Sequence, residues 1–173
     1  MGKIIFILGG ARSGKSRFAL ELAIKSKRRK VAFIATAEIG DGEMKKRVLL
    51  HRLSRPGNFE TFEEAYNLSG LLKKNAATFD VIIIDCLTLF VSNLMLKRYG
   101  ENKILDEISK VLEVLKKTNT KTIVVSNEVG LGIVPRTKLG RNFRDIAGKV
   151  NQVVARNADN VFFMVSGLPL KVK

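Results

Sequence analysis

The segment KIIFILGGARSGKS, at residues 3–16, constrains the fold more than any other part of this chain. Its apolar start is typical of a buried strand, and the strand leads directly into a match to the pattern G-x-x-x-x-G-K-[ST]. The matching residues are Gly9, Gly10, Ala11, Arg12, Ser13, Gly14, Lys15 and Ser16. Glycines let such a loop curl until its N–H groups converge on phosphate oxygens, and the helix that follows adds positive potential. The motif predicts nucleotide binding through these eight residues, against the alternative of a plain glycine turn.

Two side chains of this loop have specific expected roles. Lys15 is expected to reach the outer phosphates and act in catalysis, and Ser16 to ligate Mg²⁺. Such enzymes also need a carboxylate near the metal, commonly an Asp that ends a strand beside the first one. Asp85 ends the apolar run VIIID, so we expect it to bind magnesium and nucleotide. Capping of the following helix is the alternative role for Asp85.

Five short apolar runs rich in branched or aromatic residues are typical of parallel strands with both faces covered. They lie at residues 3–8, 31–35, 81–85, 122–126 and 161–166. Helical spacing of apolar residues predicts helices at 15–26, 42–53, 63–75, 87–99, 104–117 and 142–157. Gly100 is expected to end the fourth helix, and LKVK at the C-terminus to add a last short strand. The chain is therefore predicted to be an α/β P-loop NTPase-type domain, with a mostly parallel, doubly wound sheet flanked by helices.

Composition limits the partners of this chain. Its 173 residues have the length of one domain, which we expect to span 1–173, and its net charge of +15 attracts phosphates of any kind. The densest basic run, at 25–30, has no interleaved aromatic residues, which favours a solvated helix end over a nucleic-acid surface. No apolar run reaches the roughly 18 residues that cross a bilayer, so we expect a cytoplasmic protein. Cys86, the only cysteine, is expected to be a buried thiol.

Several further stretches together resemble one known family. They read GGARSGKSRFA, FIATAE with DGEM, RVLLHRLSRP with ET, DCLTLFVSNL, SNEVGLGIVP, and FRDIAGKVNQVVARNAD with VSGLPLK, in order along nearly the whole chain. This pattern resembles the bifunctional adenosylcobinamide kinases / adenosylcobinamide-phosphate guanylyltransferases of cobalamin biosynthesis. The resemblance implies phosphorylation of adenosylcobinamide by ATP or GTP, then transfer of GMP from GTP with release of pyrophosphate. It also implies small-molecule partners, namely a corrinoid and nucleoside triphosphates, and a homo-oligomer, which is expected to be a trimer.

His51 is the only histidine in the chain. In the family, guanylyl transfer passes through a guanylylated histidine in the motif that here reads RVLLHRLSRP, so the resemblance makes His51 the carrier of GMP. A neutral imidazole is a good nucleophile near pH 7 and can form a phosphoramidate with the α-phosphate of GTP. Glu43 and Arg47 precede His51 at helical spacing and are expected on its helix face. A structural histidine near a helix end is the alternative.

Three acidic or basic side chains near His51 are expected to contact GTP. Arg52 and Arg55 suit bidentate contacts with the triphosphate, although either is otherwise an ordinary exposed charge. Glu63, by its place in the resembling segment, is expected to accept hydrogen bonds from guanine.

Two loops leave predicted strands at the carboxyl edge, where open α/β sheets bind ligands. The first carries Thr36, Ala37 and Glu38, which we expect to bind nucleotide unless they form a plain turn. The second carries Asn127 and Glu128, which we expect to bind the acceptor substrate.

Two positions qualify this assignment. Phe90 stands where the family often has tryptophan, a change that should affect packing more than chemistry. Gly148 lies inside a predicted helix, which suggests close approach of another backbone or subunit, unless the glycine is simply tolerated. Three other activities stay open: a kinase alone, a guanylyltransferase alone, and a nucleic-acid-stimulated ATPase that only the positive charge supports.

Overall fold

The computed structural model describes residues 2–26, 30–38 and 56–173. Its strands are β1 (Lys3–Gly9), β2 (Val31–Ala35), β3 (Phe59–Glu63), β4 (Val81–Asp85), β5 (Lys121–Val125), β6 (Asn160–Val165) and β7 (Leu168–Lys171). They form one sheet in the order β3-β2-β4-β5-β1-β6-β7. All neighbours are parallel except β7, which runs antiparallel to β6. The predicted mostly parallel sheet is confirmed.

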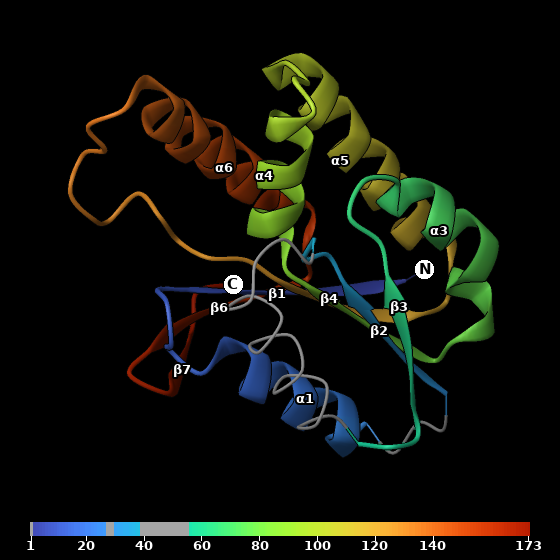
Figure 1. Cartoon of the computed structure of the whole chain (residues 1–173). Coiled ribbons are helices and arrows are strands. Elements are labelled where there is room, and N and C mark those ends of the chain that lie inside the picture. Colours follow the sequence, from blue (N-terminus) through green and yellow to red (C-terminus); the bar gives the residue numbers. More distant parts are fainter. Residues whose placement is uncertain (1, 27–29, 39–55) are drawn as a thin grey trace.

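Helices cover both faces of this sheet (Figure 1). The described helices are α1 (Lys15–Lys25), α3 (Leu68–Asn75), α4 (Leu87–Leu96), α5 (Glu101–Lys117) and α6 (Lys138–Asn157), with a 3₁₀ turn at Ala76–Thr78. Helix α1 lies on one face, and α3, α4, α5 and α6 lie on the other. No described helix has the length and apolarity that a membrane crossing requires.

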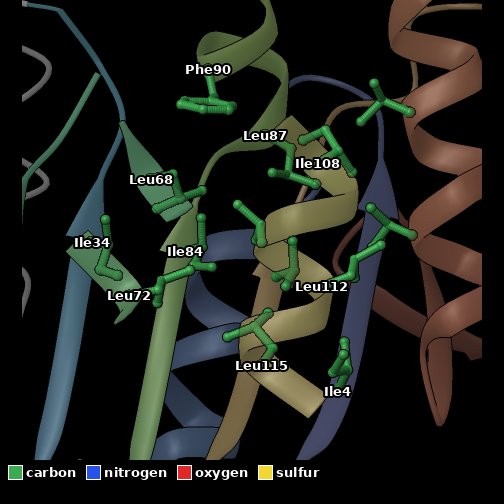
Figure 2. Close-up of a cluster of buried hydrophobic side chains, with 14 of the residues drawn as sticks. Ile4, Ile34, Leu68, Leu72, Ile84, Leu87, Phe90, Ile108, Leu112 and Leu115 are labelled. Carbon is green, nitrogen blue, oxygen red and sulfur yellow. The ribbon is translucent and has the colours of Figure 1, made fainter. Parts of the chain in front are cut away.

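The apolar strands form two cores because successive side chains of a strand point to opposite faces. In β4, Ile82 and Ile84 join the cluster under α3, α4 and α5, whereas Val81 and Ile83 join the cluster under α1. Figure 2 shows the larger cluster, in which residues from the strands meet side chains of α3, α4 and α5. The continuous apolar runs of the sequence are thus explained, since both faces of each central strand are buried.

Strand β3 is absent from the predicted strands, and the helix predicted at 63–75 begins too early. Glu63 is the last residue of β3, and α3 starts at Leu68 behind Asn67, whose side chain accepts from the Gly70 N–H. Strand β3 is an edge strand with exposed Glu60 and Glu63, so it lacks the apolar run of a strand buried on both faces. FETFE, at residues 59–63, also lacks a strict alternation of apolar and polar residues, so periodicity gave no signal for this strand.

Other boundaries differ by smaller amounts. Gly100 is the N-cap of α5, not the end of α4, which stops at Leu96 before Arg98 adopts a φ of 62°. Helix α6 begins four residues earlier than predicted, because Thr137 caps it by accepting from the Gly140 N–H. The described residues place no atom within 4 Å of a Cβ on Gly148, so close approach by the same chain is not observed there. The helix predicted at 42–53 lies outside the described residues.

Candidate active site

The phosphate loop connects β1 to α1 in a shape that requires glycine at two points. Gly9 has a φ of 150°, and a Cβ there would lie 2.7 Å from the Met164 carbonyl oxygen and 2.7 Å from the Ser13 Oγ atom. Gly14, the N-cap of α1, has a φ of 90°, in the left-handed region that favours glycine. The loop therefore packs closely against β6 and then turns sharply into the helix.

The turn between β6 and β7 supports the loop from the side. The Gly167 N–H donates to the Ser13 carbonyl oxygen over 3.1 Å. A Cβ on Gly14 would lie 3.3 Å from the Gly167 Cα atom, so the two segments touch. Sequence reasoning missed this contact, although the glycine in VSGLPLK was a visible turn signal.

The amino group of Lys15 is held inside the loop. Its Nζ atom donates to the Gly10 carbonyl oxygen over 2.6 Å and to the Ser13 Oγ atom over 3.5 Å, and the residue is only 7% exposed. Burial lowers the pKa of Lys15, while the acidic groups of Cys86 and Asp85 act in the opposite direction. The negative charge of Asp85 is thus close enough to affect the lysine of the phosphate loop.

Asp85 lies at the carboxyl end of β4, but β4 is not beside β1 as we expected. Strand β5 lies between them, and Asp85 is level with Val125 of β5. The Asp85 carboxylate and the Ser16 hydroxyl are the hard oxygen ligands that Mg²⁺ prefers, and Mg²⁺ usually keeps water and substrate phosphate as its other ligands. The residues present therefore fit the expected metal.

The first of the two strand-end loops is tied to β4 by Thr36. The Thr36 side chain is fully buried, and its hydroxyl donates to the Cys86 carbonyl oxygen over 2.6 Å and accepts from the Cys86 N–H over 2.9 Å. The hydroxyl of Thr36 thus joins two strand ends, a role that the sequence did not indicate. Burial raises the pKa of the Cys86 thiol to about 11, with a further contribution from the charge of Asp85, and the expected buried thiol is confirmed.

Beyond Thr36, the same loop turns outward. Ala37 is half-buried and Glu38 is exposed. The side chain of Glu38 hydrogen-bonds to Tyr66, which raises the pKa of the tyrosine, mainly through that bond. Glu38 is therefore positioned by the connection that follows β3.

Glu63 stands apart from the phosphate loop. It is level with Ala35 at the end of β3, and β2, β4 and β5 lie between β3 and β1. With about 4.8 Å between neighbouring strands, this order separates β3 from β1 by roughly 19 Å. Glu63 therefore shares a sheet edge with the β2 loop, whereas His51, Arg52 and Arg55 lie outside the described residues.

Asn127 and Glu128 are brought directly to the phosphate loop. Both are half-buried, and the Glu128 N–H donates to the Gly9 carbonyl oxygen over 3.1 Å. The chain beyond them forms the long orange connection to α6 in Figure 1, with exposed side chains at residues 131–134. The structure thus gathers the loop at 9–16, Asp85, Asn127 and Glu128 at one sheet edge, where phosphates, a cation and an acceptor can meet.

Comparison with known proteins identifies one matching family. The family described as cobinamide kinase / cobinamide phosphate guanyltransferase matches residues 5–172. The bifunctional adenosylcobalamin biosynthesis protein CobP of Pseudomonas aeruginosa is 44% identical, covering 96% of this chain and 95% of the relative. CobU of Salmonella typhimurium, with the same bifunctional description, is 40% identical over 98% of this chain and 99% of the relative.

Solved structures resemble the fold at much lower identity. The flagellar accessory protein FlaH from Methanocaldococcus jannaschii has a TM-score of 0.58 and 17% identity, covering 99% of this chain and 78% of that protein. A KaiC-like protein from Pyrococcus horikoshii has a TM-score of 0.53 and 16% identity, over 94% and 72% of the two chains. These likenesses support the P-loop NTPase-type fold.

Proposed function

This chain belongs to the cobinamide kinase / cobinamide phosphate guanyltransferase family, and we propose that it phosphorylates adenosylcobinamide and then converts the product to adenosylcobinamide-GDP. The observation that carries the kinase half is the buried Lys15 amino group, which points into the phosphate loop within reach of the charge of Asp85. The guanylyltransferase half rests on family membership and on His51. Residues 1–173 act as one domain in this proposal.

In the kinase step, the acceptor hydroxyl attacks the γ-phosphorus of ATP or GTP and the bond to the β-phosphate oxygen breaks. ADP or GDP leaves, and the hydroxyl proton passes to water. Backbone N–H groups of the loop and the Lys15 amino group stabilise the charge on the phosphoryl oxygens. Ser16 and Asp85 would hold Mg²⁺, which would neutralise the charge of the phosphates. Asn127 and Glu128 hold the acceptor beside the loop.

In the guanylyltransferase step, an imidazole nitrogen of His51 attacks the α-phosphorus of GTP and pyrophosphate leaves. The phosphate of adenosylcobinamide phosphate then attacks the same phosphorus and releases His51, which divides one displacement into two. Arg52 and Arg55 neutralise the triphosphate, and Glu63 accepts from guanine. Ala37 and Glu38 line the nucleotide side of the carboxyl edge, whereas the buried Thr36 supports them by joining the ends of β2 and β4.

The deciding experiment uses GTP labelled at the α-phosphate, incubated with the protein and Mg²⁺. Wild type should retain label after denaturation, and that label should be lost in acid and kept in base, as a phosphoramidate is. His51→Ala should retain no label, yet should still phosphorylate adenosylcobinamide with ATP. This pair separates the two activities within one chain.

Other outcomes discriminate the alternatives. Label that persists in His51→Ala would show that another residue carries GMP. An unlabelled wild type that phosphorylates adenosylcobinamide is a kinase alone, and a labelled wild type without phosphorylation is a guanylyltransferase alone. Lys15→Met serves as the matched control for the kinase step, because it should stop phosphorylation of adenosylcobinamide.

A further inference from the structure

Four residues form a closed ring of hydrogen bonds at the start of the loop that carries Asn127 and Glu128, the residues expected to bind the acceptor substrate. The Asn127 N–H donates to the Thr88 Oγ1 atom over 2.6 Å, and the Thr88 and Ser126 hydroxyls lie 3.0 Å apart. The Ser126 hydroxyl donates to the Asn151 Oδ1 atom over 2.8 Å, and the Asn151 Nδ2 atom donates to the Asn127 carbonyl oxygen over 3.2 Å. The ring therefore begins and ends on the main chain of one residue.

The ring has one consistent direction of donation. Because Ser126 gives its single proton to Asn151, Thr88 must donate to Ser126, and the Thr88 oxygen accepts from the Asn127 N–H. Every donor then faces an acceptor, and bonds that run in one direction polarise one another. Flipping the Asn151 amide would set its Oδ1 atom against the Asn127 carbonyl oxygen, acceptor against acceptor.

Burial makes this ring energetically decisive. Thr88, Ser126 and Asn151 are each 5% exposed or less, and Thr88 belongs to α4, whose sequence LTLFVSNLML is otherwise mostly apolar. A buried polar group left without its partner costs more than the bond itself contributes. Loss of one hydroxyl therefore displaces the main chain at Asn127 or leaves it unsatisfied.

The ring joins three elements to the phosphate loop. Thr88 comes from α4, Asn151 from α6, and Ser126 follows β5. One residue after the ring, the Glu128 N–H donates to the carbonyl oxygen of Gly9, the first loop glycine. The ring at Asn127 and the hydrogen bond to Gly9 thus together fix the position of Glu128 relative to the phosphate loop.

We propose that Thr88, Ser126 and Asn151 are positioning residues for phosphorylation of the acceptor. Their ring fixes the main chain at Asn127, so that the side chains of Asn127 and Glu128 meet the acceptor hydroxyl beside the transferred phosphate. This inference rests on the proposed kinase function. Misplacement of a bound group by about 1 Å is enough to slow such a reaction up to a hundredfold.

The test compares Thr88→Val with Thr88→Ser. Valine has nearly the shape of threonine but lacks the hydroxyl, whereas serine keeps the hydroxyl and loses only a methyl group. Thr88→Val should raise the KM for adenosylcobinamide, or lower kcat, by about tenfold or more, with the KM for ATP nearly unchanged. Thr88→Ser should stay near wild type in both constants.

Two further variants keep the test decisive. Leu94→Ala removes most of a side chain that lies on the same helix, is 1% exposed and takes no part in the ring. It should therefore lower the melting temperature with both KM values unchanged. Asn151→Asp keeps the acceptor for Ser126 but removes the donor to Asn127, and should repeat the effect of Thr88→Val if that variant does not fold.

The failures are distinguishable. An active wild type whose Thr88→Val and Asn151→Asp variants keep wild-type constants would overturn this inference alone. The same selective rise in the KM for adenosylcobinamide in Leu94→Ala would also overturn it. A wild type that does not phosphorylate adenosylcobinamide would overturn the proposed function, and this inference with it.

Discussion

The side-chain amide of Asn93 donates to the carbonyl oxygen of Thr36 over 2.7 Å. The same amide donates to the Ala65 carbonyl oxygen over 3.3 Å, so one buried residue of α4 holds the chain beyond both β2 and β3. Thr88 of the same helix accepts a hydrogen bond from the loop after β5. Helix α4 therefore carries two buried polar residues, Asn93 and Thr88, that hold different parts of the carboxyl edge.

Asn93→Leu should destabilise the protein by about 1–3 kcal/mol, because it leaves the two carbonyl groups without this donor in a buried site. Urea unfolding followed by circular dichroism would measure the change. Asn102→Leu on α5 is the matched control: Asn102 is exposed, and its replacement should alter stability by less than about 0.5 kcal/mol. Equal effects of the two substitutions would contradict the role of Asn93.

Lys15→Met should abolish phosphorylation and alter the dependence of stability on pH. Burial lowers the pKa of Lys15 in the folded protein below its ordinary value of 10.5. Between the folded pKa and 10.5, the unfolded chain therefore binds more protons than the folded one. Stability of the wild type therefore gains from Lys15 as pH rises through the folded pKa toward 10.5. The unfolding free energy of wild type minus that of Lys15→Met should increase over this range, and a flat or falling difference would refute the prediction.

Cys86 should resist alkylation in the native protein. Burial raises the pKa of its thiol from 9.0 to about 11, and the thiolate is the reactive form. Iodoacetamide at mildly alkaline pH should modify the unfolded chain within minutes and leave the folded chain unmodified, as read by mass spectrometry. The stabilising contribution of the neutral thiol is complete below 9.0 and is lost as pH rises through about 11, a loss that Cys86→Ser should not show.

Phe90→Trp should cost about 1–3 kcal/mol of stability, because Phe90 is fully buried and a larger ring overfills its site. Figure 2 shows its ring at the end of the larger core. Thermal unfolding would give the change, and Leu96→Trp, at a position 67% exposed on the same helix, should be nearly neutral. A Phe90→Trp variant as stable as wild type would mean that the site has room for a tryptophan.

Gly9→Ala should destabilise the protein and weaken ATP binding, since a Cβ at this position would lie 2.7 Å from the Met164 carbonyl oxygen. The neighbouring Gly10→Ala is the control for stability, because no atom lies within 4 Å of a Cβ there. Chemical unfolding of both variants should separate them clearly. If Gly10→Ala were the less stable of the two, the close packing of Gly9 against β6 would be in doubt.

The sequence was sufficient for the features whose cause is local. The apolar runs at residues 3–8, 31–35 and 81–85 identified central strands because both faces of such strands must be apolar. The pattern ending in Lys15 and Ser16 identified the strand, loop and helix because glycine spacing fixes that backbone path. The family followed from ordered motifs along the chain, and both the sheet class and the family are confirmed.

Tertiary structure alone decided which strands are neighbours and which polar groups meet. Strand β5 separates Asp85 from β1, and Glu63 stands at the far edge on a strand too polar to be identified by apolar patterning. The ring that joins Thr88 to Asn151 spans residues far apart in sequence, and its hydrogen bonds exist only once α4 and α6 pack on the same face. Local patterns determine elements through backbone geometry and burial, whereas the partners of a buried polar group depend on how those elements pack.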